Sequence, residues 1–374
     1  MLIVQPQQAT FPKIELESGS CIKPVTIEYE TYGKLNSQKD NAILIIHALT
    51  GTAHCAGKHQ ESDKKSGWWD SMIGPGKYID TDKYFVVCSN CLGGCSGTTG
   101  PRSINPKTGR RYNLDFPQIT IGDQVTLQKM LMDHLGLTRW LSVVGGSMGG
   151  MNTLDWTVRY PEKVVSAIPI ATTWQLSSQS IAFNWVGRKA ILSDPAWENG
   201  EYESQLPESG LSIARMLAHI TYLSDVGMDM KFGRNLQEEN KVSKDFSTSF
   251  SIESYLNYQG QRFVERFDAN CYLYLTRALD YFSLADHGNG NLTAALEKAV
   301  ADFLIVSFSS DWLFTTQQSK EVVEALKNKG KNVTFSEINS DYGHDAFLLE
   351  VNALGTMIQQ FLKYQHTKLV RGEK

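Results

Sequence analysis

The stretch "VVGGSMGG" at residues 143–150 surrounds a single serine with two pairs of glycines. Its centre fits the pattern G-x-S-x-G, with an apolar run before it and a helical pattern that begins at Met148. Between a strand and a helix, this pattern is typical of a strained turn that exposes a nucleophilic serine at the end of a sheet strand. The glycines leave room for neighbouring backbone to pass close to the turn. A glycine-rich turn without chemistry is the alternative, so Ser147 needs partners elsewhere in the chain.

Short apolar runs on both sides of this stretch predict a parallel sheet. They are rich in Val, Ile and Phe, as expected of strands that are buried on both faces. Helical patterns lie between them at 121–135 and 148–160, ended by Gly136 and Pro161. This alternation predicts an α/β fold with helices on both faces of a mostly parallel sheet. The runs are 42–49, 84–90, 140–146, 164–171 and 302–309, and a further helix and a last strand are expected near 319–330 and 332–338.

The pattern changes between the fourth and fifth of these runs. Segments 212–223, 271–282 and 291–300 have apolar residues at helical spacing, and no buried-strand run interrupts them. We therefore predict a discontinuous core domain, residues 1–172 and 300–374, and a helical lid domain at 173–299. The polar segment 236–249 is expected to be an exposed loop of the lid.

Composition excludes several classes of protein. A net charge of −4 gives no positive excess for binding nucleic acid. No window approaches the roughly 18 consecutive apolar residues of a membrane span, and the first residues lack the positive region of a signal peptide. Six cysteines in 374 residues is ordinary usage without the density of a disulfide scaffold. We expect a cytoplasmic protein with reduced thiols and no partnership with nucleic acid or membrane.

A zinc site is the alternative interpretation of the cysteines. Cys88, Cys91 and Cys95 lie close together in "CSNCLGGC", and "HCAGKH" at 54–59 adds two histidines. The spacing lacks the paired CxxC halves of structural zinc modules. We therefore interpret Cys88 as the end of a strand and the other two as part of a glycine-rich loop. No metal site and no bound cofactor are predicted.

A serine nucleophile needs a base and an orienting carboxylate. In an α/β-hydrolase fold these follow in the order Ser, Asp or Glu, His. Asp311 comes directly after the apolar run 302–309, and His344 lies in a glycine-containing loop beyond the last predicted strand. His219 falls inside a helical pattern and His47 at a strand end, where packed, hydrogen-bonded histidines are expected. We predict a catalytic triad of Ser147, Asp311 and His344.

Acyl transfer also needs donors for the oxyanion that develops in the transition state. The backbone N–H of the residue after the nucleophile, Met148, is one donor of this fold, and the loop after an earlier strand supplies the other. That loop is "HALTG" at 47–51, where Leu49 is the candidate.

The motifs "HALTG", "GGSMGG", "SSDWLF" and "YGHDAF", in this order and spacing, resemble the homoserine O-acetyltransferase family, as do "CLGGCSGTTGP" and "GLSIARMLAHITYLS". The resemblance spans nearly the whole chain. It implies a ping-pong reaction of methionine biosynthesis, in which acetyl-CoA is a co-substrate that acetylates the serine and L-homoserine accepts the acetyl group. It also implies that Arg215 and Tyr222 line the acceptor site, that Asp345 meets the ammonium group, and that the protein is a homodimer through the lid. Arg188 is a rival for the acceptor carboxylate.

Three other functions stay open at this level. Succinyl-CoA is an alternative donor, because homoserine succinyltransferases share this fold. A serine esterase or thioesterase would use the same triad and pass the acyl group to water. A non-catalytic relative would typically lack one member of the triad, whereas all three positions are filled here.

Overall fold

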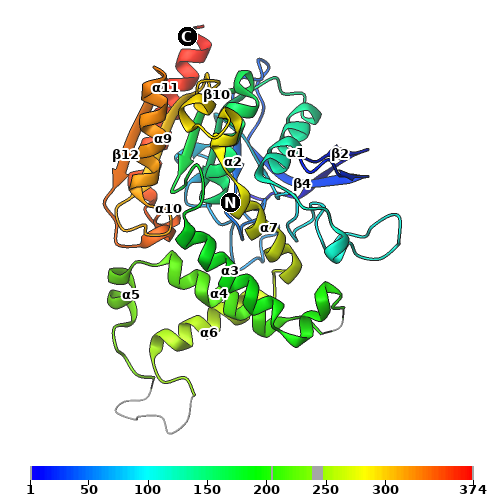
Figure 1. Ribbon diagram of the computed structural model, residues 1–374. Coiled ribbons are helices and arrows are strands. Elements are labelled where there is room, and N and C mark those ends of the chain that lie inside the picture. The colour runs from blue at the N-terminus through cyan, green and yellow to red at the C-terminus, as the bar shows by residue number, and fades with distance from the viewer. Residues whose placement is uncertain (1, 204, 238–246, 373–374) are drawn as a thin grey trace.

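The computed structural model describes residues 2–203, 205–237 and 247–372. Its centre is an eight-stranded sheet in the order β1-β4-β8-β5-β9-β10-β11-β12 (Figure 1). The strands from β8 to β12 are parallel, whereas β4 is antiparallel to both β1 and β8. Their bounds are β1 Gln7–Phe11, β4 Val25–Tyr32, β8 Phe85–Ser89, β5 Ala42–Ile46, β9 Trp140–Gly146, β10 Val164–Ile170, β11 Asp302–Phe308 and β12 Val333–Ile338.

Helices cover both faces of the sheet. Strand β5 illustrates the reason, because all five of its residues are buried. Leu44 and Ile46 join the apolar cluster formed with α1 (Ile121–His134), α2 (Met148–Arg159) and α9 (Thr316–Asn328). Ile43 and Ile45 join a second cluster, which includes α11 (Val351–Val370). The continuous apolar runs are therefore strands with two buried faces, and the predicted architecture, a mostly parallel sheet with helices on both faces, is confirmed.

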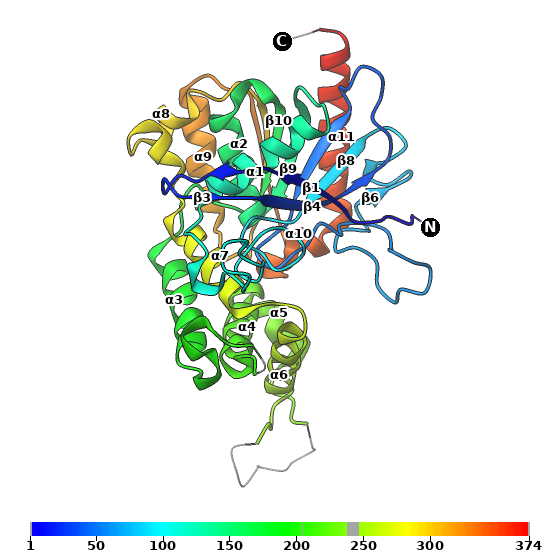
Figure 2. The same ribbon diagram turned by 90° about the vertical axis from the view of Figure 1, so that its right-hand side faces the viewer.

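Five helices lie beyond the carboxyl ends of the parallel strands, and we refer to them as the lid helices. Figures 1 and 2 show them gathered at one end of the molecule. Helix α4 packs against α3 and α6, and it also contacts the short turn that contains His344. Most of the polar segment predicted as a loop, residues 238–246, lies outside the described residues. The lid helices are α3 Ser178–Leu192, α4 Glu208–Tyr222, α5 Asp225–Phe232, α6 Ser251–Val264 and α7 Ala269–Tyr281.

The last part of the segment assigned to the lid packs elsewhere. Helix α8 (Leu292–Leu296) contacts α9 and α2, which belong to the layer on the sheet. The described chain thus returns to the core before residue 299. Within the described residues, no helix combines the length and apolar character needed to cross a bilayer.

Candidate active site

Ser147 occupies the sharp turn between β9 and α2. Its backbone has φ 58° and ψ −123°, in the positive-φ region that non-glycine residues rarely adopt. The turn is held by the Ser147 N–H, which donates to the carbonyl of Ile170 at 3.0 Å. Strain of this kind persists only where the surroundings enforce it, and it is concentrated at functional sites. The geometry is that of the nucleophile turn that the sequence pattern predicted.

Gly149 explains why the pattern requires a glycine two residues after the serine. A Cβ atom built there would lie 2.1 Å from the carbonyl oxygen of Ile46, at the end of β5. Backbone at this distance cannot move aside without shifting the strand. The first turn of α2 is thereby held against the loop that follows β5, where Leu49 lies.

We expect Gly149→Ala to lower the free energy of unfolding by about 1–3 kcal/mol, because the added methyl group overpacks a rigid backbone contact. Gly187→Ala in α3 is the matched control, since its Cβ would meet nothing closer than the Tyr272 hydroxyl at 3.1 Å. Urea unfolding of both variants measures the difference. Equal stability of the two variants would contradict the steric explanation.

The three predicted triad residues lie in one hydrogen-bonded chain. The Ser147 hydroxyl donates to His344 Nε2 at 2.9 Å, and His344 Nδ1–H donates to Asp311 Oδ2 at 2.8 Å. The other carboxylate oxygen of Asp311 accepts the backbone N–H groups of Leu313 and Phe314, at 3.0 and 2.9 Å. Asp311 is thus held as an acceptor, and it fixes the imidazole tautomer that leaves Nε2 free to take the serine proton.

Electrostatics around His344 favour its role as a base near neutral pH. Burial alone would lower its pKa, but the charge and hydrogen bond of Asp311, together with the charge of Asp345, outweigh burial and raise that pKa above 6.5. Burial raises the pKa of Asp345 as well, against the opposing effect of the positive charges on His344 and Arg215. The base is therefore stabilised in its protonated form, as an intermediate imidazolium requires.

The two candidate oxyanion donors are both near the nucleophile: Met148 follows Ser147 in the chain, and Leu49 lines the same cavity as Ser147. Met148 is fully buried at the start of α2. Neither backbone N–H donates a hydrogen bond to another group in the part of the chain that the structure describes. His47 is buried between the carbonyl of Ala48 and the N–H of Cys91, and burial lowers its pKa to about 4. It is the packed, neutral histidine that the sequence suggested.

The predicted acceptor residues surround the ring of Tyr222. The Arg215 guanidinium lies 5.5 Å from the centre of this ring, and the His344 ring lies 5.9 Å from it on centroids. Arg215 Nη1 donates to the Thr50 hydroxyl at 3.3 Å, which ties α4 to the loop that carries Leu49. The structure thus brings Arg215 and Tyr222 next to the triad, and Asp345 follows His344 directly. Their binding roles stay predictions.

Arg188 is engaged elsewhere. Its Nη2 donates to the buried carboxylate of Asp280, which balances its charge, while its Nη1 has no partner among the described residues.

Two neighbours of Arg215 were not predicted as part of the site: Arg266, and His219, which the sequence suggested only as a packed histidine. Arg266 stacks on the same ring, Phe263, as Arg215 does, and its Nη1 donates to the carbonyl of Thr50 at 3.0 Å. Burial and the charge of Arg215 lower the pKa of Arg266. Neither arginine has a salt-bridge partner among the described residues. His219 packs against Tyr222 with 5.7 Å between ring centres. The one sequence signal for this position of His219 is its spacing of four residues from Arg215, which is about one helical turn.

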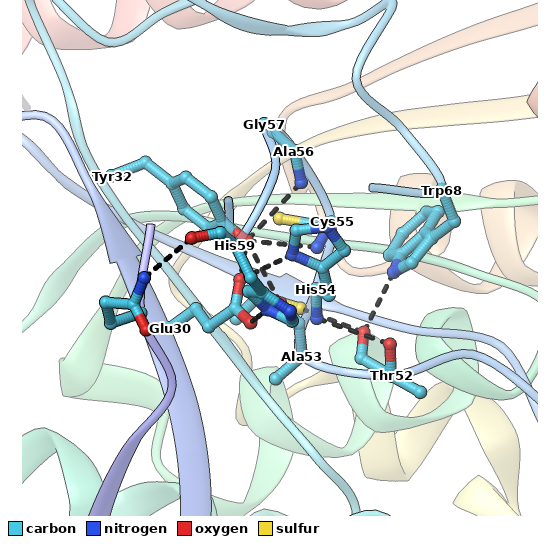
Figure 3. A network of polar contacts seen from close by, with 12 residues as sticks. Glu30, Tyr32, Thr52, Ala53, His54, Cys55, Ala56, Gly57, His59 and Trp68 are labelled. Atoms are coloured by element: carbon cyan, nitrogen blue, oxygen red, sulfur yellow. Dashed lines mark hydrogen bonds and ion pairs between the residues drawn. The ribbon is translucent and has the colours of Figure 1, made fainter. Parts of the chain in front are cut away.

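A buried carboxylate anchors the loop that follows β5 (Figure 3). Glu30 of β4 accepts hydrogen bonds from the Tyr32 hydroxyl at 2.5 Å, from His54 Nδ1 at 3.0 Å and from His59 Nε2 at 2.7 Å. Burial alone would raise the pKa of Glu30, but these hydrogen bonds outweigh it and lower that pKa. The network therefore fixes residues 54–59 of the loop that begins at His47 and contains Leu49.

Among the described residues, the side chains of this network are also placed so that they could bind a metal ion. The ligand atoms of Glu30, His54 and His59 lie within 4.8 Å of one another, and two imidazoles with a carboxylate are a known zinc donor set. Each imidazole is already hydrogen-bonded to the carboxylate, however, which accounts for the arrangement. Cys88 is buried at the end of β8, and all six cysteines are free thiols, none of which belongs to this group.

Comparisons with known proteins agree with this geometry. The family model described as alpha/beta hydrolase fold matches residues 41–351. A homoserine O-acetyltransferase from Methanococcus vannielii is 56% identical over 94% of this chain and 71% of its own length. The crystal structure of homoserine O-acetyltransferase from Bacillus anthracis has a TM-score of 0.92 at 34% identity, over 97% of this chain and 98% of that one. Esterase E22 has a TM-score of 0.90 at 35% identity, over 96% of this chain and 100% of that one. The chain belongs to the homoserine O-acetyltransferase family of α/β-hydrolase-fold proteins.

Proposed function

We propose that this chain transfers the acetyl group of acetyl-CoA to the side-chain hydroxyl of L-homoserine, as a step of methionine biosynthesis. The observation that carries the proposal is the hydrogen-bonded chain of Ser147, His344 and Asp311 beside two residues of opposite charge, Arg215 and Asp345. A free amino acid carries a carboxylate and an ammonium group, which these two charges complement. Water, the acceptor of a hydrolase, needs neither.

The reaction proceeds in two half-reactions that use the same base. In the first, His344 Nε2 takes the Ser147 proton while Oγ attacks the thioester carbonyl, and the imidazolium then returns the proton to the departing CoA thiolate. In the second, Nε2 takes the proton of the homoserine hydroxyl, whose oxygen attacks the acetyl-serine. The bond between the acetyl carbon and Ser147 Oγ then breaks, and the imidazolium returns the proton to Oγ, which restores the free serine. The N–H groups of Leu49 and Met148 stabilise the oxyanion in both. The acyl group arrives on its own carrier, so the chemistry needs no resident cofactor.

The cavity over Ser147 supports acetyl as the acyl group. Leu176, Phe183, Leu279, Leu313 and Phe314 contribute apolar side chains to it, and its described lining contains no lysine or arginine. The free carboxylate of a succinyl group would be buried there without a cationic side chain in the lining to pair with, which is unfavourable. An acetyl methyl group has no such cost.

An esterase is the second candidate function, because esterase E22 matches this chain at nearly the same TM-score as the acetyltransferase does. An esterase would discharge the acetyl-serine to water at the same rate with or without an amino acid. The complementary charges of Arg215 and Asp345 favour transfer, because water as an acceptor would need neither.

Release of free CoA from acetyl-CoA and from succinyl-CoA, each with and without L-homoserine, tests the proposal. We expect CoA release that depends on homoserine and is much faster with acetyl-CoA. Release that homoserine does not change would support the esterase, and a preference for succinyl-CoA would support the other acyltransferase.

Arg215→Met is expected to lower kcat/KM for homoserine about 10- to 100-fold, through loss of charge-assisted hydrogen bonds to the carboxylate. Acetylation of the enzyme by acetyl-CoA should change little, because that half-reaction precedes acceptor binding. Arg262→Met in α6, which removes an exposed pair with Glu265, is the matched control. Initial rates over a range of homoserine concentrations measure the effect, and equal rates for the two variants would argue against the assignment of Arg215.

We further propose a cytoplasmic homodimer. Six free cysteines fit a reducing compartment. Lid helices α3, α4 and α5 carry half-exposed apolar side chains, a feature of surfaces that associate. These are Trp185, Val186, Ile213, Val226 and Met230. Sedimentation at micromolar concentration, with Trp185→Glu as the disrupting variant, tests this proposal.

A further inference from the structure

Two buried polar atoms on helix α4 have no hydrogen-bond partner among the described residues. They are Nε of Arg215 and Nε2 of His219, in side chains that are nine-tenths or more buried. Residues four apart on a helix lie on the same face, so the two atoms belong to one patch. Buried polar groups are nearly always satisfied, because an unmet one destabilises the protein. A patch with two of them is arranged for a group that the chain itself does not supply.

This patch is continuous with the catalytic centre through Tyr222. The ring of Tyr222 contacts the Arg215 guanidinium, the His219 ring and the His344 ring, with separations of 5.5, 5.7 and 5.9 Å between centres. Tyr222 also lines the cavity that contains Ser147. Tyr222 is thus the ring that joins the lining of this cavity to Arg215 and His219.

The protonation of His219 follows from its neighbours. Burial and the positive charges of Arg215, Lys231 and Arg266 lower its pKa to about 3, so the ring is neutral. Its Nδ1 lies 3.2 Å from the Tyr255 hydroxyl, and burial raises the pKa of that phenol, which keeps its proton. With Tyr255 as donor to Nδ1, the ring hydrogen is on Nε2.

We infer that the Nε–H of Arg215 and the Nε2–H of His219 together bind the carboxylate of the acceptor amino acid, so that His219 is a second substrate-binding residue. The inference rests on the proposed function, because it needs an acceptor with a carboxylate. Two adjacent N–H donors suit the two oxygens of that group. Arg266 and Lys231 add positive charge near His219.

His219→Met removes the donor at similar bulk, and His219→Gln places an amide N–H near the position of Nε2. We expect the methionine variant to raise KM for L-homoserine about 10- to 100-fold and the glutamine variant to restore most of the loss. Formation of the acetyl-enzyme from acetyl-CoA should be unchanged in both. His134→Met, at the exposed end of α1, is the control for loss of a histidine.

The compound 3-amino-1-propanol, which lacks the carboxylate of homoserine, separates binding from a structural role. As an acceptor it should react equally with wild type and His219→Met. An unchanged KM for homoserine in His219→Met overturns the inference, and so does an equal loss with both acceptors. A wild-type enzyme that acetylates no homoserine overturns the proposed function itself, and the inference with it.

Discussion

Ser147→Ala is expected to lower kcat for homoserine-dependent release of CoA by about 10⁴-fold or more, the usual scale for removal of a triad nucleophile. Without Oγ there is no atom to receive the acetyl group, and His344 Nε2 loses the hydrogen bond that links it to the turn. Binding of acetyl-CoA should persist, because the cavity and the oxyanion donors are unchanged. Steady-state assay of CoA release with 5-thio-2-nitrobenzoate detection measures the loss.

Ser142→Ala provides the matched control. Ser142 is a buried serine in the same strand, β9, and its hydroxyl has no partner among the described residues. Its replacement should leave kcat within a few-fold of wild type. Substantial acetyl transfer by Ser147→Ala would show that a different group carries the acetyl.

Asp311→Asn should lower kcat by about 10⁴-fold with little change in stability. The amide oxygen can still accept from the N–H groups of Leu313 and Phe314, so the loop is retained. The amide NH₂ would then face His344 Nδ1 and force that nitrogen to accept. The ring hydrogen would move to Nε2, which could no longer take a proton from Ser147. Thermal unfolding in parallel with the assay separates this effect from misfolding.

The dependence of activity on pH provides a second measurement on Asp311 and His344. The base acts only when it is neutral, and Asp311 contributes to a pKa of His344 above 6.5. Activity of the wild type should therefore fall as the pH drops through a value above 6.5, and the residual activity of Asp311→Asn should persist to lower pH. If the activity of the wild type fell only at a pH below 6.5, the ordinary pKa of histidine, the proposed effect of Asp311 on His344 would be contradicted.

The catalytic residues could be predicted because each follows from local pattern and chain order. Ser147 lies in a G-x-S-x-G pattern, which predicts a nucleophile turn when it stands between a strand and a helix. Asp311 and His344 follow strands whose carboxyl ends meet at one edge of the sheet. The apolar runs that became β5, β8, β9, β10 and β11 needed only burial on both faces to be recognised.

Other features depend on packing that sequence does not reveal. Strand β4 alternates buried and partly exposed residues and contains Glu30, a charge that pattern alone places on the surface. Only its hydrogen bonds with Tyr32, His54 and His59 make its burial tolerable. The roles of Arg266 and His219 likewise depend on how the lid helices meet the loop after β5. Helix α8 ends at Leu296, well short of the predicted 300, because the chain must extend to enter β11 at Asp302.

Mass spectrometry of the intact protein and of its Ser147 peptide tests the central claim most directly. After brief mixing with acetyl-CoA, we expect one acetyl group on Ser147, which L-homoserine removes as the O-acetyl amino acid faster than water does. Ser142→Ala should acquire the same adduct, and Ser147→Ala should not. A protein that turns over acetyl-CoA with homoserine yet never carries acetyl on Ser147 would contradict the acyl-serine mechanism.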